Sequence, residues 1–347
     1  MSGPDPSASE VRGEGVLEVS DLEVAFQTED GRVHAVNGIS FELRRGEVLA
    51  IVGESGSGKS VTALTMMGLT RSPNASISGQ VVLKGDDLVA ADDERLRRMR
   101  GNEIAMIFQD PMSSLNPVYR VGEQIVEGIL AHREISKDEA RARAIELMKE
   151  VGIPGADERI DNYPHEFSGG MRQRVMIAMA LALDPEVLIA DEPTTALDVT
   201  IQAQILRLIK RLNDEQNVAT ILITHDLGVV AEIADRVLVM YGGRIVESGT
   251  LEQIFYDPQH PYTWGLLGSV TRLDRPSNER LVQIDGQPPS LISPPAGCHF
   301  RPRCPFAFEK CTTKPELVNH TAEADHFDRC HLPAEQRSTL RHAEVEV

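Results

Sequence analysis

Cysteines, aromatic residues and long apolar runs are all scarce in this chain. Its 347 residues include four cysteines, one tryptophan and 4% aromatic residues in total. The longest uninterrupted apolar run, Val175 to Leu183, has nine residues, whereas a helix that spans a membrane needs roughly 20. The sequence therefore argues against a helical membrane protein. We expect a soluble protein, although it could still dock on a membrane protein.

Positive charge is also in the minority. The chain has 35 Lys and Arg against 53 Asp and Glu, which gives a formal net charge of −18. This balance makes the chain a poor candidate for wrapping nucleic acid, although a local basic site stays possible. Residues 1–15 lack the apolar stretch of a secretory signal, and we interpret them as a disordered leader. The length predicts about two domains.

The most specific motif is GESGSGKS at residues 53–60, called the phosphate loop below. It follows an apolar run at 48–52 and precedes a helical pattern at 61–67, the context that a G-x-x-x-x-G-K-[ST] loop requires. Glycines let backbone N–H groups turn toward a phosphate, and the helix dipole favours the same anion. Lys59 should contact the β- and γ-phosphates, and Ser60 should bind Mg²⁺. The predicted nucleotide-binding residues here are Gly53, Ser55, Gly56, Ser57, Gly58, Lys59, Ser60 and Val61.

Residues 16–43 alternate apolar and polar positions around a turn at Glu29-Asp30-Gly31. Such alternation predicts an antiparallel hairpin beside the nucleotide loop. Phe26 lies where an aromatic ring could stack on adenine. It could equally be a core aromatic of a strand, and the sequence alone does not decide between the two.

Polar side chains follow two apolar strand patterns. Gln109 comes after residues 104–108, and His225 comes after residues 220–224. Open α/β sheets place their ligand groups at the carboxyl ends of their strands. We therefore predict that Gln109 takes part in catalysis and in Mg²⁺ binding, and that His225 hydrogen-bonds a γ-phosphate. Alone, each residue is more often a loop or structural residue.

A third apolar strand pattern, residues 187–190, ends in the two acids Asp191 and Glu192. Successive strand residues point to opposite sides, so these two carboxylates should not share one task. We assign Asp191 to the Mg²⁺ shell and Glu192 to polarising the attacking water. After a phosphate loop, this pattern is typical of a Walker B strand.

Helical patterns occupy much of the rest. Residues 121–151 form an insert with a capping box of Ser136 and Glu139. Ser168, Gly169 and Gly170 precede a helix that we expect at 175–183, with Ser168 as its N-cap. Their open N–H groups predict a second phosphate-facing helix start, or else merely a capped helix after a turn. Asp198 lies near the start of a further amphipathic helix.

Over residues 16–255, the chain resembles the ATP-binding subunits of ABC transporters. The order and spacing of its motifs carry the resemblance: residues 53–60, Gln109, residues 168–170, Asp191, Glu192, Asp198 and His225. The resemblance implies that Ser168 to Met171 form the signature loop, which acts on ATP held by a partner subunit in a head-to-tail dimer. Phe167 and Met171 stand where the commonest signature has Leu and Gln. This form is similar to the D-type subunits of dipeptide, oligopeptide and nickel importers, which act beside an F-type ATPase partner.

The resemblance also implies an assembly and a location. Two transmembrane permeases and an extracytoplasmic substrate-binding protein would be the other partners, with this chain on the cytoplasmic face of the inner membrane. Residues 109–117 and the segments around His260, Cys298 and Cys330 are similar to the same branch. The expected activity is ATP hydrolysis that drives peptide uptake. The transported molecule could instead be nickel or glutathione.

All four cysteines lie in a Gly- and Pro-rich tail, residues 256–347, with the spacing C-x5-C-x6-C-x18-C. Such a cluster without an export signal points to metal more than to disulfides. Zinc sites usually have C-x2-C pairs, and none occurs here. The resemblance favours a [4Fe–4S] cluster over Zn²⁺, with unliganded cysteines in a small core as the third alternative. The predicted ligands are Cys298, Cys304, Cys311 and Cys330.

The predicted fold is an α/β P-loop ATPase domain with an antiparallel β edge and a helical insert, followed by a small cysteine-rich domain. We place the ATP-binding domain at 16–255, its helical subdomain at about 112–183 and the C-terminal domain at 256–347. Two other classes of protein predict different features. An ABC ATPase acting on DNA or ribosomes should carry a coiled-coil insert or a second cassette, and a soluble nucleotide- and redox-responsive binding module would not need Glu192.

Overall fold

The computed structural model describes residues 14–195, 197–269, 284–319, 321 and 325–345. The predicted leader, residues 1–15, lies almost wholly outside the described residues. The chain divides into two compact units. The first comprises Met1–Glu18, Phe41–Val48 and Val81–Leu222, and the second comprises Val19–Ser40, Leu49–Gln80 and Ile223–Val347.

The first sheet has four strands in the order β2-β1-β4-β5. Strands β1 and β2 are joined by a two-residue turn at Glu29 and Asp30, which confirms the predicted hairpin. Apolar residues alternate inward along β1, where Leu22 and Val24 are fully buried. The strand bounds are β1 Gly15–Thr28, β2 Gly31–Arg44, β4 Ala75–Leu83 and β5 Asp86–Asp87.

The first unit contains a parallel strand pair, β6 and β7, in which Ile107 lies opposite Ala190. All residues of both strands are buried, as expected for strands covered on both faces. Strand β8 begins in this unit, where Ala219 donates its N–H to the Glu186 carbonyl. The bounds are β6 Ile104–Ile107, β7 Val187–Asp191, β8 Ala219–Thr224, α2 Asp93–Met99, α3 Pro111–Ser114 and α8 Val199–Gln216.

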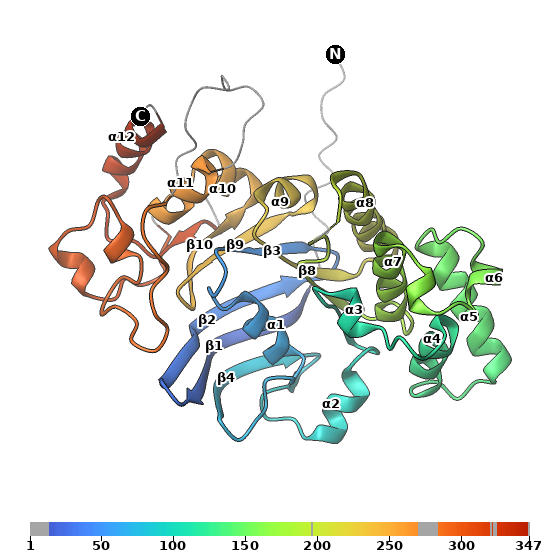
Figure 1. The fold of residues 1–347 in the computed structure, drawn as a ribbon. Helices are drawn as coiled ribbons and strands as arrows, with labels where there is room; N and C mark the ends of the chain where they lie inside the picture. The colour runs from blue at the N-terminus through green and yellow to red at the C-terminus, as the bar shows by residue number, and fades with distance from the viewer. Residues whose placement is uncertain (1–13, 196, 270–283, 320, 322–324, 346–347) are drawn as a thin grey trace, which may run out of the picture. The chain divides into compact units, whose positions relative to one another are not determined.

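The predicted helical insert is present in the first unit, and Figure 1 shows it in green as α4, α5 and α6. The capping box of Ser136 and Glu139 starts α5 as predicted. The helix expected to run to Leu183 begins earlier and ends at Ala180, so its predicted bounds were wrong. The bounds are α4 Val121–Leu130, α5 Lys137–Glu150, α6 Ala156–Arg159, η2 Pro164–Glu166 and α7 Gly169–Ala180.

The second unit contains strands in the order β11-β10-β9-β3. Strand β3 runs parallel to β9, whereas β10 pairs antiparallel with β9 and with β11. The tail residues Tyr262 and Phe300 pack in one buried core with Ala50 of β3 and Val237 of β9. The bounds are β3 Val48–Val52, α1 Lys59–Met66, α9 Leu227–Ile233, β9 Arg236–Tyr241, β10 Arg244–Thr250, α10 Leu251–Tyr256, α11 Pro261–Gly268 and β11 Phe327–Asp328.

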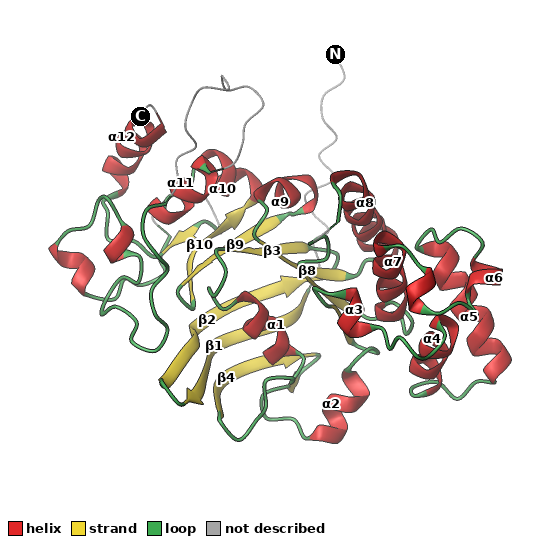
Figure 2. Cartoon of the chain, viewed as in Figure 1, coloured by secondary structure: helices red, strands yellow, loops and turns green. Residues whose placement is uncertain are grey.

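The end of the chain is mainly loop, which Figure 2 shows in green between short helices. Those helices are η3 Arg301–Arg303, η4 Glu309–Thr312 and α12 Ala334–Val345. A buried ion pair joins Arg337 of α12 to Asp328 of β11 at 2.6 Å. In the described part of the chain, no helix is both long and apolar enough to cross a membrane.

Candidate functional site

The phosphate loop leaves a fully buried strand and enters α1. Gly53 and Gly58 have φ of 152° and 102°. A Cβ on Gly53 would lie 2.1 Å from the Met240 carbonyl oxygen, and one on Gly58 would lie 2.4 Å from that of Ala35. Only glycine fits such close backbone approaches. The neighbouring backbone of β2 and β9 therefore leaves no room for a side chain at either glycine of the motif.

Lys59 lies with its ammonium against the beginning of the loop. Its Nζ donates to the carbonyl oxygens of Gly53 at 2.7 Å and of Glu54 at 2.9 Å. The residue is 5% exposed. The backbone of residues 53–58 therefore surrounds the Lys59 ammonium. This arrangement places a positive charge beside the backbone N–H groups that should bind a phosphate.

Gln109 and Glu192 meet at the carboxyl ends of β6 and β7. Because the two strands are parallel and in register, the residues two positions past Ile107 and Ala190 emerge at the same edge. The Gln109 Nε2 donates to Glu192 Oε2 at 2.9 Å, and Thr195 Oγ1 donates to the same oxygen at 2.9 Å. The predicted Gln109 and Glu192 therefore form a hydrogen-bonded pair.

The strand β7 ends one residue earlier than predicted. Asp191 is its last residue and is 6% exposed, whereas Glu192 lies beyond the strand with φ of 46°. We predicted that Asp191 and Glu192 point to opposite sides because both lie on one strand. This reason was wrong, because Glu192 lies after the strand and its left-handed backbone conformation sets the direction of its side chain. A non-glycine residue in this region is strained and is often found at functional sites.

The signature loop, residues 168–171, packs against the start of α8. The Ser168 side chain caps α7 and accepts a hydrogen bond from the Met171 N–H at 3.4 Å, as predicted. Asp198 caps α8 and accepts from Ile201 N–H at 3.0 Å. A Cβ on Gly170 would lie 2.7 Å from the Ile201 side chain. The structure therefore brings the predicted residues Ser168, Gly170 and Asp198 close together.

The remaining nucleotide-site residues lie in the second unit. Phe26 is half-buried on β1, and His225 is exposed directly after β8. Asp226 next to it caps α9 by accepting from Gly228 N–H at 2.8 Å. The assigned roles of Phe26 and His225 stay predictions.

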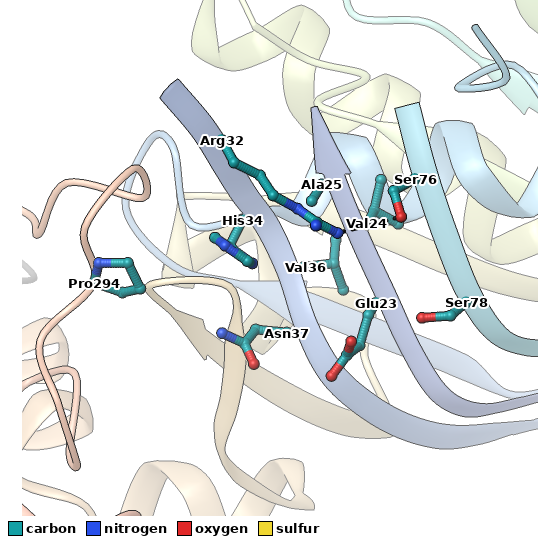
Figure 3. Close-up of a pocket in the computed structure, with 10 residues that line it drawn as sticks. All are labelled: Glu23, Val24, Ala25, Arg32, His34, Val36, Asn37, Ser76, Ser78 and Pro294. Atoms are coloured by element: carbon teal, nitrogen blue, oxygen red, sulfur yellow. Dashed lines mark hydrogen bonds between the residues drawn. The ribbon is translucent and has the colours of Figure 1, made fainter. Parts of the chain in front are cut away.

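A cavity of about 250 Å³ lies on the hairpin of β1 and β2 (Figure 3). Ala25, Val36 and His34 line it, and Phe26 is not among its lining residues. Pro294 of the tail completes the lining, as Figure 3 shows to one side of His34. The cavity therefore gives no support to the adenine contact of Phe26, but it shows that the tail reaches the hairpin.

All four cysteines are free thiols. Burial, with a contribution from the other thiols, raises the pKa of Cys304 and of Cys330 to about 12. Burial likewise raises the pKa of Cys298, whose N–H donates to the Cys311 carbonyl at 3.0 Å. Within the described ranges, no three His, Cys, Asp or Glu side chains are arranged to hold a metal ion. The cluster therefore stays a prediction.

Two tail residues that were not among the predicted site residues contact the phosphate loop. Arg303 forms an ion pair with Glu54 at 2.6 Å, and the Tyr262 hydroxyl accepts a hydrogen bond from the Glu54 N–H at 2.9 Å. Both lie more than 200 positions away in the chain. Contacts at such separation leave no local pattern that could have identified them.

Comparison with known proteins agrees with this arrangement. The ABC transporter family model matches residues 36–195, and the model of the C-terminal region of oligopeptide/dipeptide transporters matches residues 246–311. The ATP-binding cassette MJ0796, solved as a dimer bound to ADP and Pi, has a TM-score of 0.61 and 28% identity, covering 68% of this chain and 98% of its own. The structure of cbiO1 from Clostridium perfringens has a TM-score of 0.59 and 30% identity, covering 70% and 92%.

Curated relatives are similar over nearly their whole length. The oligopeptide transport ATP-binding protein OppD of Bacillus subtilis is 55% identical, covering 86% of this chain and 84% of the relative. The dipeptide transport ATP-binding protein DppD of the same organism is 56% identical, covering 86% and 89%. OppD of Escherichia coli is 51% identical, covering 94% and 95%. This chain therefore belongs to the ATP-hydrolysing subunits of ABC transporters, in the branch of the oligopeptide and dipeptide transport ATP-binding proteins.

Proposed function

We propose that this chain hydrolyses ATP to power the import of oligopeptides or dipeptides through separate transmembrane permeases. The observation that carries the proposal is the Gln109–Glu192 pair at one strand edge, in a chain that also keeps the phosphate loop and its lysine. Several relatives are named for oligopeptide or dipeptide transport. No observation favours nickel or glutathione import, or a nucleotide-responsive binding module, over peptide import.

The residue roles in hydrolysis follow from charge and position. Lys59 neutralises the β- and γ-phosphates, and Glu192 orients and polarises the attacking water. Ser60, Asp191 and Gln109 offer hydroxyl, carboxylate and amide oxygens, which are the hard donors that Mg²⁺ prefers. When bound, Mg²⁺ would neutralise charge on the phosphates. His225 completes the set as a hydrogen-bond partner of the γ-phosphate, and Phe26 stacks on adenine.

We assign the signature loop to the nucleotide of a second ATPase subunit. Ser168, Gly169 and Gly170 start a 12-residue helix, whose N-terminal N–H groups and dipole favour an anion. MJ0796, which is similar over 68% of this chain, was solved as a dimer with ADP and Pi. The departure of the signature from the commonest form supports an F-type ATPase as the partner in a head-to-tail heterodimer.

Three exposed apolar side chains support permease docking in the first unit. Met112, Val118 and Tyr119 follow Gln109 within ten residues and are 54%, 72% and 55% exposed. Contiguous exposed apolar patches mark surfaces that bind other proteins, and these three side chains lie close together in the sequence. A permease seated here would contact the segment that leads from Gln109. We propose that the chain lies on the cytoplasmic face of the inner membrane, with a substrate-binding protein on the other side.

The proposed assembly can be tested by affinity purification of the tagged chain from its native membranes. We expect mass spectrometry to find two permeases, a second ATPase and a peptide-binding protein. A tagged chain with Val118→Asp and Tyr119→Asp is the matched control, because it should lose the permeases while it keeps ATP binding. Recovery of ribosomes or DNA-bound proteins in place of permeases would contradict the transport function.

We also propose that the four cysteines hold a [4Fe–4S] cluster. All four lie in one loop-rich segment, and thiolates are the donors that iron–sulfur clusters use. The raised pKa values of Cys304 and Cys330 keep these two thiols protonated without a metal, so binding must displace their protons. Zinc and a small core of unliganded thiols are the alternatives.

Anaerobic purification tests the cluster directly. We expect roughly four iron atoms per chain, as a [4Fe–4S] cluster contains, together with a visible absorption band. Cys330→Ser should lose both, because it removes one of the ligands. One equivalent of zinc without iron would contradict the proposal and favour the zinc alternative. Absence of any metal would favour unliganded thiols.

A further inference from the structure

Every polar group of Glu54, the second residue of the phosphate loop, is engaged. Its carboxylate pairs with Arg303, and its N–H donates to the Tyr262 hydroxyl. Its carbonyl oxygen accepts a hydrogen bond from Lys59 Nζ at 2.9 Å. Glu54 is therefore held by the tail on one side and by the functional lysine on the other, so a change in the tail contacts can reach Lys59 through a single residue.

Arg303 is built into the tail as a fixed group. Its side chain is 5% exposed. Its two terminal guanidinium nitrogens donate to the two carboxylate oxygens of Glu54 at 2.6 and 3.1 Å. The same guanidinium donates to the carbonyl oxygens of Ile284 and Asp285 at 3.0 and 2.8 Å. Burial disfavours its charge, but hydrogen bonds to Glu54 and Tyr241 raise its pKa above the ordinary value. The ion pair is therefore bidentate and held in one geometry.

The same part of the tail also touches the hairpin. The His34 N–H of β2 donates to the Leu291 carbonyl at 2.8 Å. A Cβ on Gly31 would lie 2.9 Å from the Ile292 side chain, and Pro294 lines the hairpin cavity (Figure 3). The segment between residues 284 and 303 thus contacts the phosphate loop and the strand pair that carries Phe26.

We propose that Arg303 is a positioning residue for ATP binding, which acts through Glu54 on Lys59. Arg303 neutralises a carboxylate that stands within the phosphate loop and would otherwise repel the nucleotide. By holding the Glu54 side chain, it also restrains the residue whose carbonyl oxygen accepts a hydrogen bond from the Lys59 ammonium. The inference rests on the proposed role of this loop in binding ATP, and it assigns to the tail a part in that binding through Glu54.

The test measures the dissociation constant of a fluorescent ATP analogue with Mg²⁺ on the full chain. Arg303→Gln should weaken binding about tenfold, equivalent to about 1.4 kcal/mol, because it leaves the Glu54 charge uncompensated. Arg303→Lys keeps the charge but not the two-pronged geometry, and about threefold weaker binding is expected. Arg301→Gln is the matched control, since it removes the same charge from the same loop at a side chain with no ion pair to Glu54.

A rescue experiment separates charge compensation from tail structure. Glu54→Gln alone should weaken binding less than threefold, and adding it to Arg303→Gln should restore most of the lost affinity. If Arg303→Gln and Arg301→Gln bind alike, or if Glu54→Gln gives no rescue, the inference is wrong. If Arg303→Gln lowers the melting temperature strongly, Arg303→Lys takes its place. Glu54→Gln added to Arg303→Lys should then restore most of the affinity that Arg303→Lys loses, and no restoration would contradict the inference. Failure of the unsubstituted chain to bind the analogue would instead contradict the proposed function.

Discussion

Glu192→Gln should lower the rate of ATP hydrolysis by about 100-fold or more and leave ATP binding unchanged. A carboxylate that polarises an attacking water contributes on the order of 100- to 10,000-fold to a rate. The glutamine keeps the size of the side chain and can still accept from Gln109 and Thr195, which bond the carboxylate at 2.9 Å. Only the charge is lost. The measurement is phosphate release by the assembled complex, with nucleotide affinity measured in parallel.

The matched control is Glu94→Gln, which neutralises an exposed carboxylate of α2 in the same unit. Its ion pair with Arg97 lies on the surface, and such pairs contribute little to stability. Hydrolysis by this variant should equal that of the unsubstituted protein. If Glu192→Gln hydrolyses ATP at nearly the rate of the unsubstituted protein, the role assigned to Glu192 is wrong. The residue that activates the attacking water would then have to be sought elsewhere.

Several elements that local sequence patterns specify were predicted correctly, whereas the bounds of the helix expected at 175–183 were wrong. The hairpin follows from alternating apolar residues, which require one buried face, and the buried strands follow from short apolar runs. The phosphate loop was recognised because its glycines are demanded by backbone packing, which the structure finds at Gly53 and Gly58. The caps Ser136 and Ser168 were predicted because a cap acts on a neighbour three residues away, and Asp198, which was predicted to lie near a helix start, caps α8.

Features that depend on the whole fold were not predictable. The turn that gives Glu192 a positive φ leaves no composition signal, because glutamate does not favour that conformation. His299 and His326 of the tail are buried and bond to the Gly242 carbonyl and to the Glu247 carboxylate, and no local pattern indicates these contacts. The Arg303–Glu54 pair joins residues 249 positions apart. Such contacts are fixed only when strands and loops from distant segments assemble.

Loss of this chain should abolish the uptake that it powers. ATP hydrolysis in this branch is the energy source for transport, so an assembly without a working Glu192 should bind ATP and fail to turn over. Cells that lack the chain should therefore take up labelled peptide at the rate of cells without ATP-driven uptake. Re-expression of the unsubstituted chain should restore the rate, and re-expression of Glu192→Gln should not.

The measurement that tests the central claim most directly is the initial rate of uptake of a labelled dipeptide and a labelled oligopeptide in these three strains. The account predicts that at least one of the two peptides enters only when the unsubstituted chain is present. Glu94→Gln serves as the active control and should support full uptake. Uptake of both peptides that is unchanged by loss of the chain, or fully restored by Glu192→Gln, would contradict the claim that its ATP hydrolysis drives peptide import.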